Sequence, residues 1–87
     1  MRVSNMVSSN GNDIPNQFII HMEDGSVVFQ SYSTVIAIKQ NGTVVLDKDW
    51  NYSRTTSKYR NQFLRETTKE TERKIKSGKY EVKELNK

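Results

Sequence analysis

Two dipeptides that favour tight turns, each set between runs of strand-forming residues, constrain this chain most strongly. Asp24-Gly25 separates residues 16–22 from residues 26–32, and Asn41-Gly42 separates residues 34–39 from residues 43–46. Both dipeptides tolerate positive φ at two successive positions, as the type I′ turn of a two-residue hairpin requires. Because the flanking runs are rich in Ile, Val and Phe, we predict two β-hairpins.

Several of the predicted strands are apolar on both faces. Successive apolar residues such as Ile19-Ile20 and Val27-Val28-Phe29 place their side chains on opposite sides of a strand. A lone two-stranded hairpin is only marginally stable, so we expect all four strands to join one antiparallel sheet. The link at residues 30–34 contains no Gly or Pro, and it is either a short turn or a bulge that bends the sheet strongly.

Helical signals follow the strands. Ser53 or Thr55 can cap a first helix, on which Tyr59 and Phe63 lie one turn apart on the same face. The segment 67–70, Thr-Thr-Lys-Glu, has the form of a capping box and predicts a second helix that ends near residue 78, a glycine. Residues 80–85 are predicted to form a last strand or a docked tail.

Together these elements predict an α+β fold. It has a four-stranded antiparallel sheet built from two hairpins, followed by two C-terminal helices that cover one face of the sheet. The polar run at residues 8–13 cannot bury enough apolar area to offset its ordering entropy. We therefore predict a flexible tail over residues 1–15 and one α+β domain over residues 16–87.

Composition excludes several kinds of chemistry. The chain has no cysteine, which removes disulfides and thiolate sites, and no apolar run approaches the ~18 residues of a membrane span. We expect a soluble, cytoplasmic protein with no membrane contact. His21 is the single histidine, and its strand context favours a structural role over that of a ligand or base. No Gly-rich phosphate loop or catalytic triad is visible, so we expect neither an enzyme nor a cofactor.

One segment partly fits a calcium-binding loop. Loop positions 1, 3, 5 and 7 are occupied by Asp47, Asp49, Asn51 and Ser53. The pattern then fails, because Tyr52 stands where the loop needs Gly and Lys58 stands where it needs an acidic ligand. A turn that leads into a helix is the favoured interpretation, with a hard cation as the alternative.

Charge is distributed unevenly along the chain. The net charge is +4, with −2 on residues 1–53 and +6 on residues 54–87. A basic C-terminal third suits an anionic partner, although a solvated helix rich in Lys and Glu gives a similar composition.

Aromatic and basic side chains alternate between residues 50 and 64. We expect Trp50 and Phe63 to pack on the sheet, because so small a chain needs them in its core. The remaining side chains of this run are of types that recur in binding hot spots and on nucleic-acid stacking surfaces. The predicted binding residues are Tyr52, Arg54, Lys58, Tyr59 and Arg60, with Arg73, Lys74 and Lys76 adding charge.

Two segments carry a family resemblance. FQSYSTVIA at residues 29–37 and YSRTTSKYRNQFL at residues 52–64 resemble a family of small uncharacterised proteins of phages and prophages of Gram-positive bacteria. The similarity covers residues 16–80 and implies a genomic setting rather than a mechanism. Small non-enzymatic phage proteins of this kind are often inhibitors of host machinery, with anti-CRISPR proteins as the leading class.

The first hypothesis is a phage accessory protein that binds and inhibits a host defence factor, such as a CRISPR effector protein or ribonucleoprotein. The alternative is a nucleic-acid-binding accessory protein that uses the basic C-terminal helices, and a third hypothesis is a structural protein of the virion. Monomer and homodimer both fit a small sheet with open edges. DNA mimicry is disfavoured, because a mimic needs dense negative charge.

Overall fold

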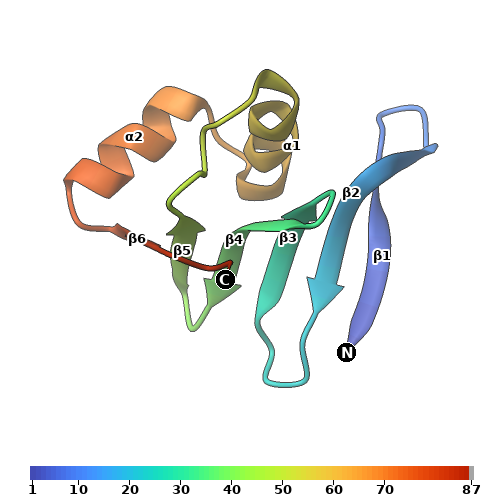
Figure 1. The fold of residues 1–87 in the computed structure, drawn as a ribbon, viewed down its shortest axis with the longest axis horizontal. Helices are drawn as coiled ribbons and strands as arrows, with labels where there is room; N and C mark the ends of the chain where they lie inside the picture. The colour runs from blue at the N-terminus through green and yellow to red at the C-terminus, as the bar shows by residue number, and fades with distance from the viewer. Residues whose placement is uncertain (87) are drawn as a thin grey trace.

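A six-stranded mixed sheet with two helices forms the computed structural model, which describes residues 1–86 (Figure 1). In chain order the elements are β1 (Arg2–Val7), β2 (Asp13–His21), β3 (Val27–Ser31), β4 (Thr34–Gln40), β5 (Thr43–Asp47), α1 (Arg54–Leu64), α2 (Thr68–Lys76) and β6 (Tyr80–Lys83). The strands lie in the sheet in the same order, antiparallel from β1 to β5, and β6 runs parallel to β5.

The α+β class and the two helices are confirmed, but the four-stranded antiparallel sheet is wrong. β1 and β6 extend the sheet at its two edges. Residues 1–15, which the sequence predicted as a flexible tail, instead form β1 and the start of β2. The polar run at residues 8–13 is largely the turn between these strands. Met6 and Ile14 reach the core on either side of it, with exposed fractions of 5% and 8%. Backbone pairing does not depend on side-chain polarity, so composition alone gave the wrong result here.

Both predicted hairpins are confirmed, but the turn at Asp24-Gly25 is not the expected type I′ turn, because Gly25 has φ of 93° and Asp24 has no positive φ. Asn41 and Gly42 have φ of 50° and 77°, as a type I′ turn requires. In the other hairpin the Asp24 carboxylate accepts bonds from the backbone and hydroxyl of Ser26 at 2.9 and 2.6 Å. At residues 30–34 the structure contains both of the predicted alternatives. Tyr32 has φ of 56° in a short turn, and the β3–β4 register shifts at Phe29/Gln30.

Both helices begin where the capping signals predict. The Ser53 hydroxyl accepts the backbone N–H of Thr56 at 3.1 Å, and Thr67 and Glu70 form a complete capping box. Gly78 follows α2 with φ of 83°, a left-handed conformation that favours glycine.

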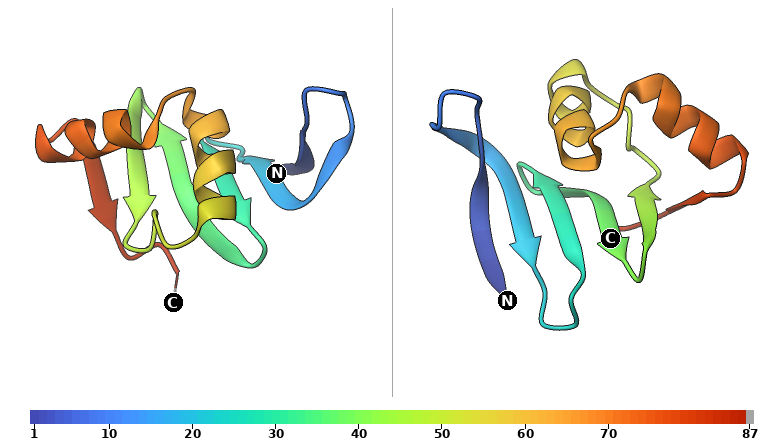
Figure 2. Two further views of the ribbon diagram at one scale, coloured as in Figure 1. Left: turned by 90° about the horizontal axis from the view of Figure 1, so that it is seen from above. Right: turned by 180° about the vertical axis from the view of Figure 1, so that it is seen from behind.

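Both helices lie in the connection between the parallel strands β5 and β6, and they pack on the same face of the sheet (Figures 1 and 2). Phe63 of α1 stacks on Phe29 of β3 with ring centroids 5.6 Å apart. Ile75 of α2 and Tyr80 of β6 pack against the same cluster. Its buried members are Met6, Ile14, Phe29, Ile36, Ala37, Val44, Leu46, Phe63 and Leu64.

The chain end is held by polar contacts to distant strands. The Asp47 carboxylate accepts the backbone N–H of Leu85 at 2.7 Å. The Asn86 amide both donates to and accepts from the Val35 backbone, each at 2.8 Å. The predicted last strand is confirmed as Tyr80–Lys83, and Leu85 and Asn86 dock through these polar contacts.

Candidate binding surface

The most concentrated exposed positive charge lies on α1, α2 and the turns that follow them. Seven basic side chains between residues 54 and 79 are exposed, against two exposed acidic ones, Glu70 and Glu72. None of the seven forms an ion pair with any carboxylate of residues 1–86. We call these seven the basic helical layer: Arg54, Lys58, Arg65, Lys69, Arg73, Lys76 and Lys79.

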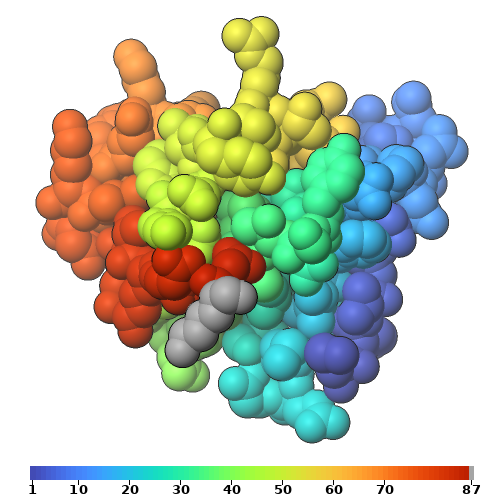
Figure 3. Space-filling model, viewed as in Figure 1, coloured from blue at the N-terminus to red at the C-terminus, as the bar shows by residue number. Residues whose placement is uncertain are grey.

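The segments that carry this layer form one margin of the molecule. In Figure 3 residues of α1 (yellow) and α2 (orange) occupy this margin, and long side chains project from both helices into solvent. Residues 1–53, which form β1 to β5 and the loop before α1, have a net negative charge, with three basic and five acidic side chains. Positive charge is therefore segregated to the helical side of the fold.

Three of the predicted binding residues surround the first half of α1. Tyr52 is 53% exposed, and with Arg54 it lines a shallow hollow that Asn51 and Ser57 complete. Lys58 is exposed and its Nζ lies 5.3 Å from the centroid of the neighbouring Tyr59 ring. The first turn of α1 has no acidic side chain, so nothing there neutralises the partial positive charge of the helix N-terminus.

Arg60 is not exposed, and the prediction that it contacts a partner is wrong. Its exposed fraction is 0%, and its guanidinium lies 4.8 Å from the centroid of the Trp50 ring. Nη1 donates to the Trp50 carbonyl at 2.7 Å, and Nη2 donates to Thr68 Oγ1 at 2.7 Å and to Asn61 Oδ1 at 2.9 Å. Arg60 thus joins the loop before α1 to the start of α2.

Burial lowers the pKa of Arg60, while the carboxylates of Glu66 and Glu72 oppose that effect. A guanidinium stays charged in proteins across all ordinary pH values, so this is a buried cation held by neutral acceptors. Helical spacing gave a signal for this burial, because Arg60 lies three and four residues before Phe63 and Leu64 and so shares their face of α1, whereas Arg54 and Lys58 do not.

The predicted residues of α2 divide in the same way. Arg73 and Lys76 are exposed and belong to the basic helical layer. Lys74 is half-buried, and its Nζ lies 2.6 Å from Glu66 Oε1, whose side chain is only 3% exposed. Tyr80 Oη donates to the same Glu66 oxygen at 2.9 Å. Lys74 therefore helps to fix α2 to β6 rather than presenting its charge to a partner.

These contacts shift the titration of the whole cluster. Burial opposes ionisation of Glu66, but bonds from Lys74, Thr71 and Tyr80 outweigh it and hold the pKa of Glu66 below its ordinary value of 4.5. The hydrogen bond to Glu66 raises the pKa of Lys74. Burial, followed by the bond to Glu66, raises the pKa of Tyr80.

The predicted core aromatics are confirmed, and Tyr59 joins them. Phe63 is 7% exposed, and Trp50 and Tyr59 pack against the core cluster while remaining partly accessible. Tyr59 was predicted as a binding residue, and only its accessible edge is open to that role.

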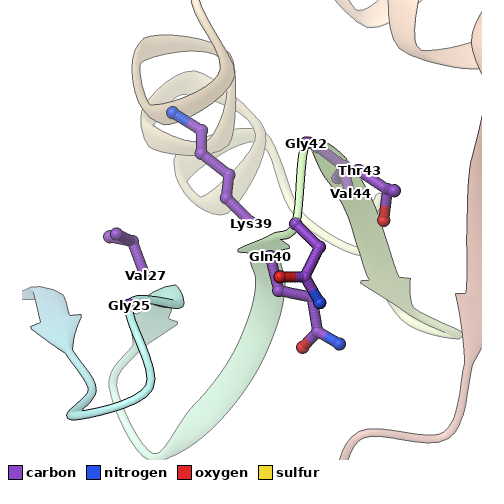
Figure 4. Close-up of a pocket in the computed structure, with 8 residues that line it drawn as sticks. Gly25, Val27, Lys39, Gln40, Gly42, Thr43 and Val44 are labelled. Carbon is purple, nitrogen blue, oxygen red and sulfur yellow. The ribbon is translucent and has the colours of Figure 1, made fainter.

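Lys39 of β4 is a site residue that the sequence did not single out. It lies between two open hollows of about 360 and 540 Å³ on the helix-bearing face. Figure 4 shows its side chain extended away from Gly42 and toward a helix, which is α1. Its Nζ donates to the Phe63 carbonyl at 2.7 Å and lies 4.4 Å from the Phe63 ring centroid.

Burial lowers the pKa of Lys39, and the nearby Arg65 guanidinium lowers it further. Two cations thus face one hollow, whose apolar floor includes Ile19 and Val27. A lysine two residues from the buried Ala37 on the same strand face was the available signal.

The turn that partly fits a calcium loop is held together by backbone donors instead. Asp47 is 1% exposed, and its carboxylate accepts from the backbone N–H groups of Asp49 and Leu85. Burial raises the pKa of Asp47, but these bonds outweigh it and leave the pKa below the ordinary value of 3.8. Across residues 1–86 no three or more acidic or histidine side chains gather in a way that could hold a metal ion.

Comparisons with known proteins add one finding. The model of a family of unknown function, DUF8033, matches residues 1–79, and so includes the segment that forms β1. No curated protein and no solved structure matches the chain. None of the helices in the described part of the chain is long and apolar enough to cross a membrane.

Proposed function

Because this chain belongs to DUF8033, a family of unknown function, we propose a function from its surface: it is a non-catalytic binding protein that docks its basic helical layer on an anionic macromolecule. The observation that carries the proposal is the segregation of charge. Seven exposed basic side chains lie with two exposed acidic ones on the helical side, and none of the seven is neutralised by an ion pair within residues 1–86. Such a field raises the association rate with partners of opposite charge.

The proposed partner is an acidic surface of a host defence effector, such as a CRISPR ribonucleoprotein, which the protein inhibits as a phage accessory protein. The charge of the helical layer supports an anionic partner, and the resemblance of residues 29–37 and 52–64 to phage proteins supports the host setting. Exposed Tyr52 beside Arg54 supplies the aromatic and guanidinium pair that often dominates such interfaces.

A cleavage assay with a purified, guide-loaded CRISPR effector tests this proposal. The protein is expected to reduce target cleavage at a stoichiometric dose, and the triple change Arg54→Glu, Lys58→Glu, Arg73→Glu is expected to abolish the effect. Arg2→Glu is the control, since Arg2 is an exposed basic residue on β1, outside the helical layer. Full inhibition by the triple variant would remove the helical layer from the mechanism.

The second candidate is direct binding of nucleic acid through the same layer. The exposed Tyr52 ring beside Arg54 favours it, because aromatic rings stack on unpaired bases with little dependence on sequence. Fluorescence anisotropy with labelled single- and double-stranded DNA and RNA tests this candidate.

For nucleic acid, log affinity should fall linearly with log salt, and Lys58→Ala should reduce the slope by about 1. Arg2→Ala should leave the slope unchanged. Absence of binding to all four probes at low salt would end this candidate and leave the protein partner as the remaining one.

A further inference from the structure

The face of the sheet opposite the helices carries a continuous apolar row across five strands. Cross-strand partners share a face of a sheet, and the register joins Val3 to Ile20, Ile20 to Val28, Val28 to Ile38 and Ile38 to Val45. The row contains only Val and Ile. In the neighbouring row, Phe18 of β2 and Val35 of β4 extend the apolar surface on either side of Gln30.

This row is separate from the core. The adjacent row, which includes Phe29, Ala37 and Leu46, faces the helices, and all three of these side chains are 0% exposed. Within residues 1–86, no member of the Val3–Val45 row belongs to the core cluster or packs against it. Val3 is 52% exposed, Ile20, Ile38 and Val45 are half-buried, and Val28 is covered although it lies outside that cluster.

The apolar face carries one charged side chain on β1 to β5, Asp47, which follows Val45 by two residues and so lies on the same face. Asp47 is 1% exposed and its carboxylate accepts the backbone N–H groups of Asp49 and Leu85. The two rows otherwise consist of Val, Ile, Phe, Asn and Gln, and Glu81 and Lys83 of β6, next in register, pair with one another at 3.5 Å. A nucleic acid or an acidic protein gains no electrostatic attraction here. An apolar face with little exposed charge is complementary to another face of the same kind.

From this surface we propose that two copies of the chain associate back to back through their helix-free sheet faces. Sheets of two protomers can pack about 10 Å apart with apolar side chains interleaved, as in a β-sandwich. A two-fold axis makes such an interface self-complementary, because the same row meets itself.

The size of the face sets the strength of this association. Five strands spaced by about 4.8 Å, and the two rows of alternate residues along them, give about 330 Å² of planar area per copy. That is well below the roughly 800 Å² per partner of a standard interface, so the association is expected to be weak and reversible.

Charge favours this arrangement over others for a second copy. Back-to-back packing places the two basic helical layers on opposite outer surfaces. They lie about 30 Å apart if each helix layer adds about 10 Å to the sheet spacing. The Debye length is only about 8 Å at physiological salt, so repulsion between the layers is screened. A contact that brings the helical layers together would juxtapose seven unpaired cations on each copy.

Sedimentation velocity over a range of protein concentrations tests the proposal. The unaltered protein is expected to shift from monomer to dimer as concentration rises. Ile20→Lys and Ile38→Lys should each raise the dissociation constant at least tenfold, because each places a charge in the apolar row. Val82→Lys is the matched control, since Val82 is 39% exposed on β6 and pairs with Leu46 on the opposite face.

Circular dichroism and thermal unfolding of each variant separate loss of association from loss of folding. If Ile38→Lys does not fold, Val3→Lys at the most exposed position of the row replaces it. A protein that stays monomeric at millimolar concentration overturns the proposal. So does a dimer that persists in both Lys variants, which would point to pairing through the free edge of β1 instead.

Discussion

The two faces of the sheet have nearly the same apolar composition, but only one of them is covered by helices. On one face Phe29, Ala37 and Leu46 are fully buried beneath α1 and α2, whereas on the other Ile20, Ile38 and Val45 remain partly exposed. The difference comes from the connection between β5 and β6, which carries both helices over one side. Apolar alternation therefore identifies strands, but the crossover decides which of their faces becomes the core.

Truncation of one side chain on each face should give the largest contrast. Phe63→Ala on the covered side is expected to lower the free energy of unfolding by about 3–5 kcal/mol, because it removes a buried ring that stacks on Phe29. Val45→Ala on the helix-free side should cost about 1 kcal/mol or less at low protein concentration. Urea titration measures both. Equal losses would mean that the helix-free row is core in the monomer, and Phe63→Leu serves if the Ala variant does not fold.

A buried cation and an exposed one in the same helix give the next contrast. Arg60→Ala is expected to destabilise the fold by about 3 kcal/mol, because it leaves the Trp50 carbonyl and the Asn61 and Thr68 side chains without their donor. Arg60→Lys should recover only part of this loss, since an ammonium lacks the planar fork of the guanidinium. Lys58→Ala should change stability little. An unchanged unfolding midpoint in Arg60→Ala would contradict a structural role.

Acid should act through two carboxylates that hold the edges of the helical side. The pKa values of Asp47 and Glu66 are both lowered in the folded state, from ordinary values of 3.8 and 4.5. Their contribution to stability is therefore fully present above those ordinary values, and it is lost as pH falls through the lower folded-state values. Unfolding free energy measured from pH 6 down to pH 3 should decline, and Glu66→Gln should flatten the decline. An unaltered slope in that variant would exclude Glu66 from the effect.

The smallest contrast is between neighbouring lysines of α2. Lys74→Ala should lower the unfolding midpoint, because it leaves the nearly buried Glu66 carboxylate without its cation. Lys76→Ala should stay within about 0.5 kcal/mol, as is usual for exposed surface positions. Thermal unfolding at neutral pH compares the two. A larger loss for Lys76 would show that it makes contacts beyond the exposed surface.

Local signals in the sequence predicted the local structure well. The Asn41-Gly42 turn and the capping box at residues 67–70 depend only on residues close to them in the chain, so the sequence is enough to predict them. The packing of Trp50 and Phe63 followed from the scarcity of other large apolar residues. What failed depended on distant partners: β1 forms because β2 pairs with it, and β6 joins the sheet because β5 offers a free edge.

The residues of the candidate surface show the same difference between local signals and contacts with distant residues. Arg54, Lys58, Arg73 and Lys76 were identified as basic and are exposed, which helical periodicity alone supports. Arg60 lies on the buried face of its helix, and both Arg60 and Lys74 are held by acceptors outside their own helices, which composition alone does not reveal. Lys39 was missed because its neighbours in space, Phe63 and Arg65, lie more than twenty residues away.

The parallel pairing of β6 with β5 has a consequence for the order in which the structure forms. Strands β1 to β5 pair through successive hairpins and close only short loops, whereas β6 can pair only after both helices span the connection between residues 47 and 80. Contacts of such sequence separation slow folding, because the loop entropy is lost before they form. The meander is therefore expected to assemble first, and the amides of β6 to exchange with solvent through openings that leave β2 to β4 intact.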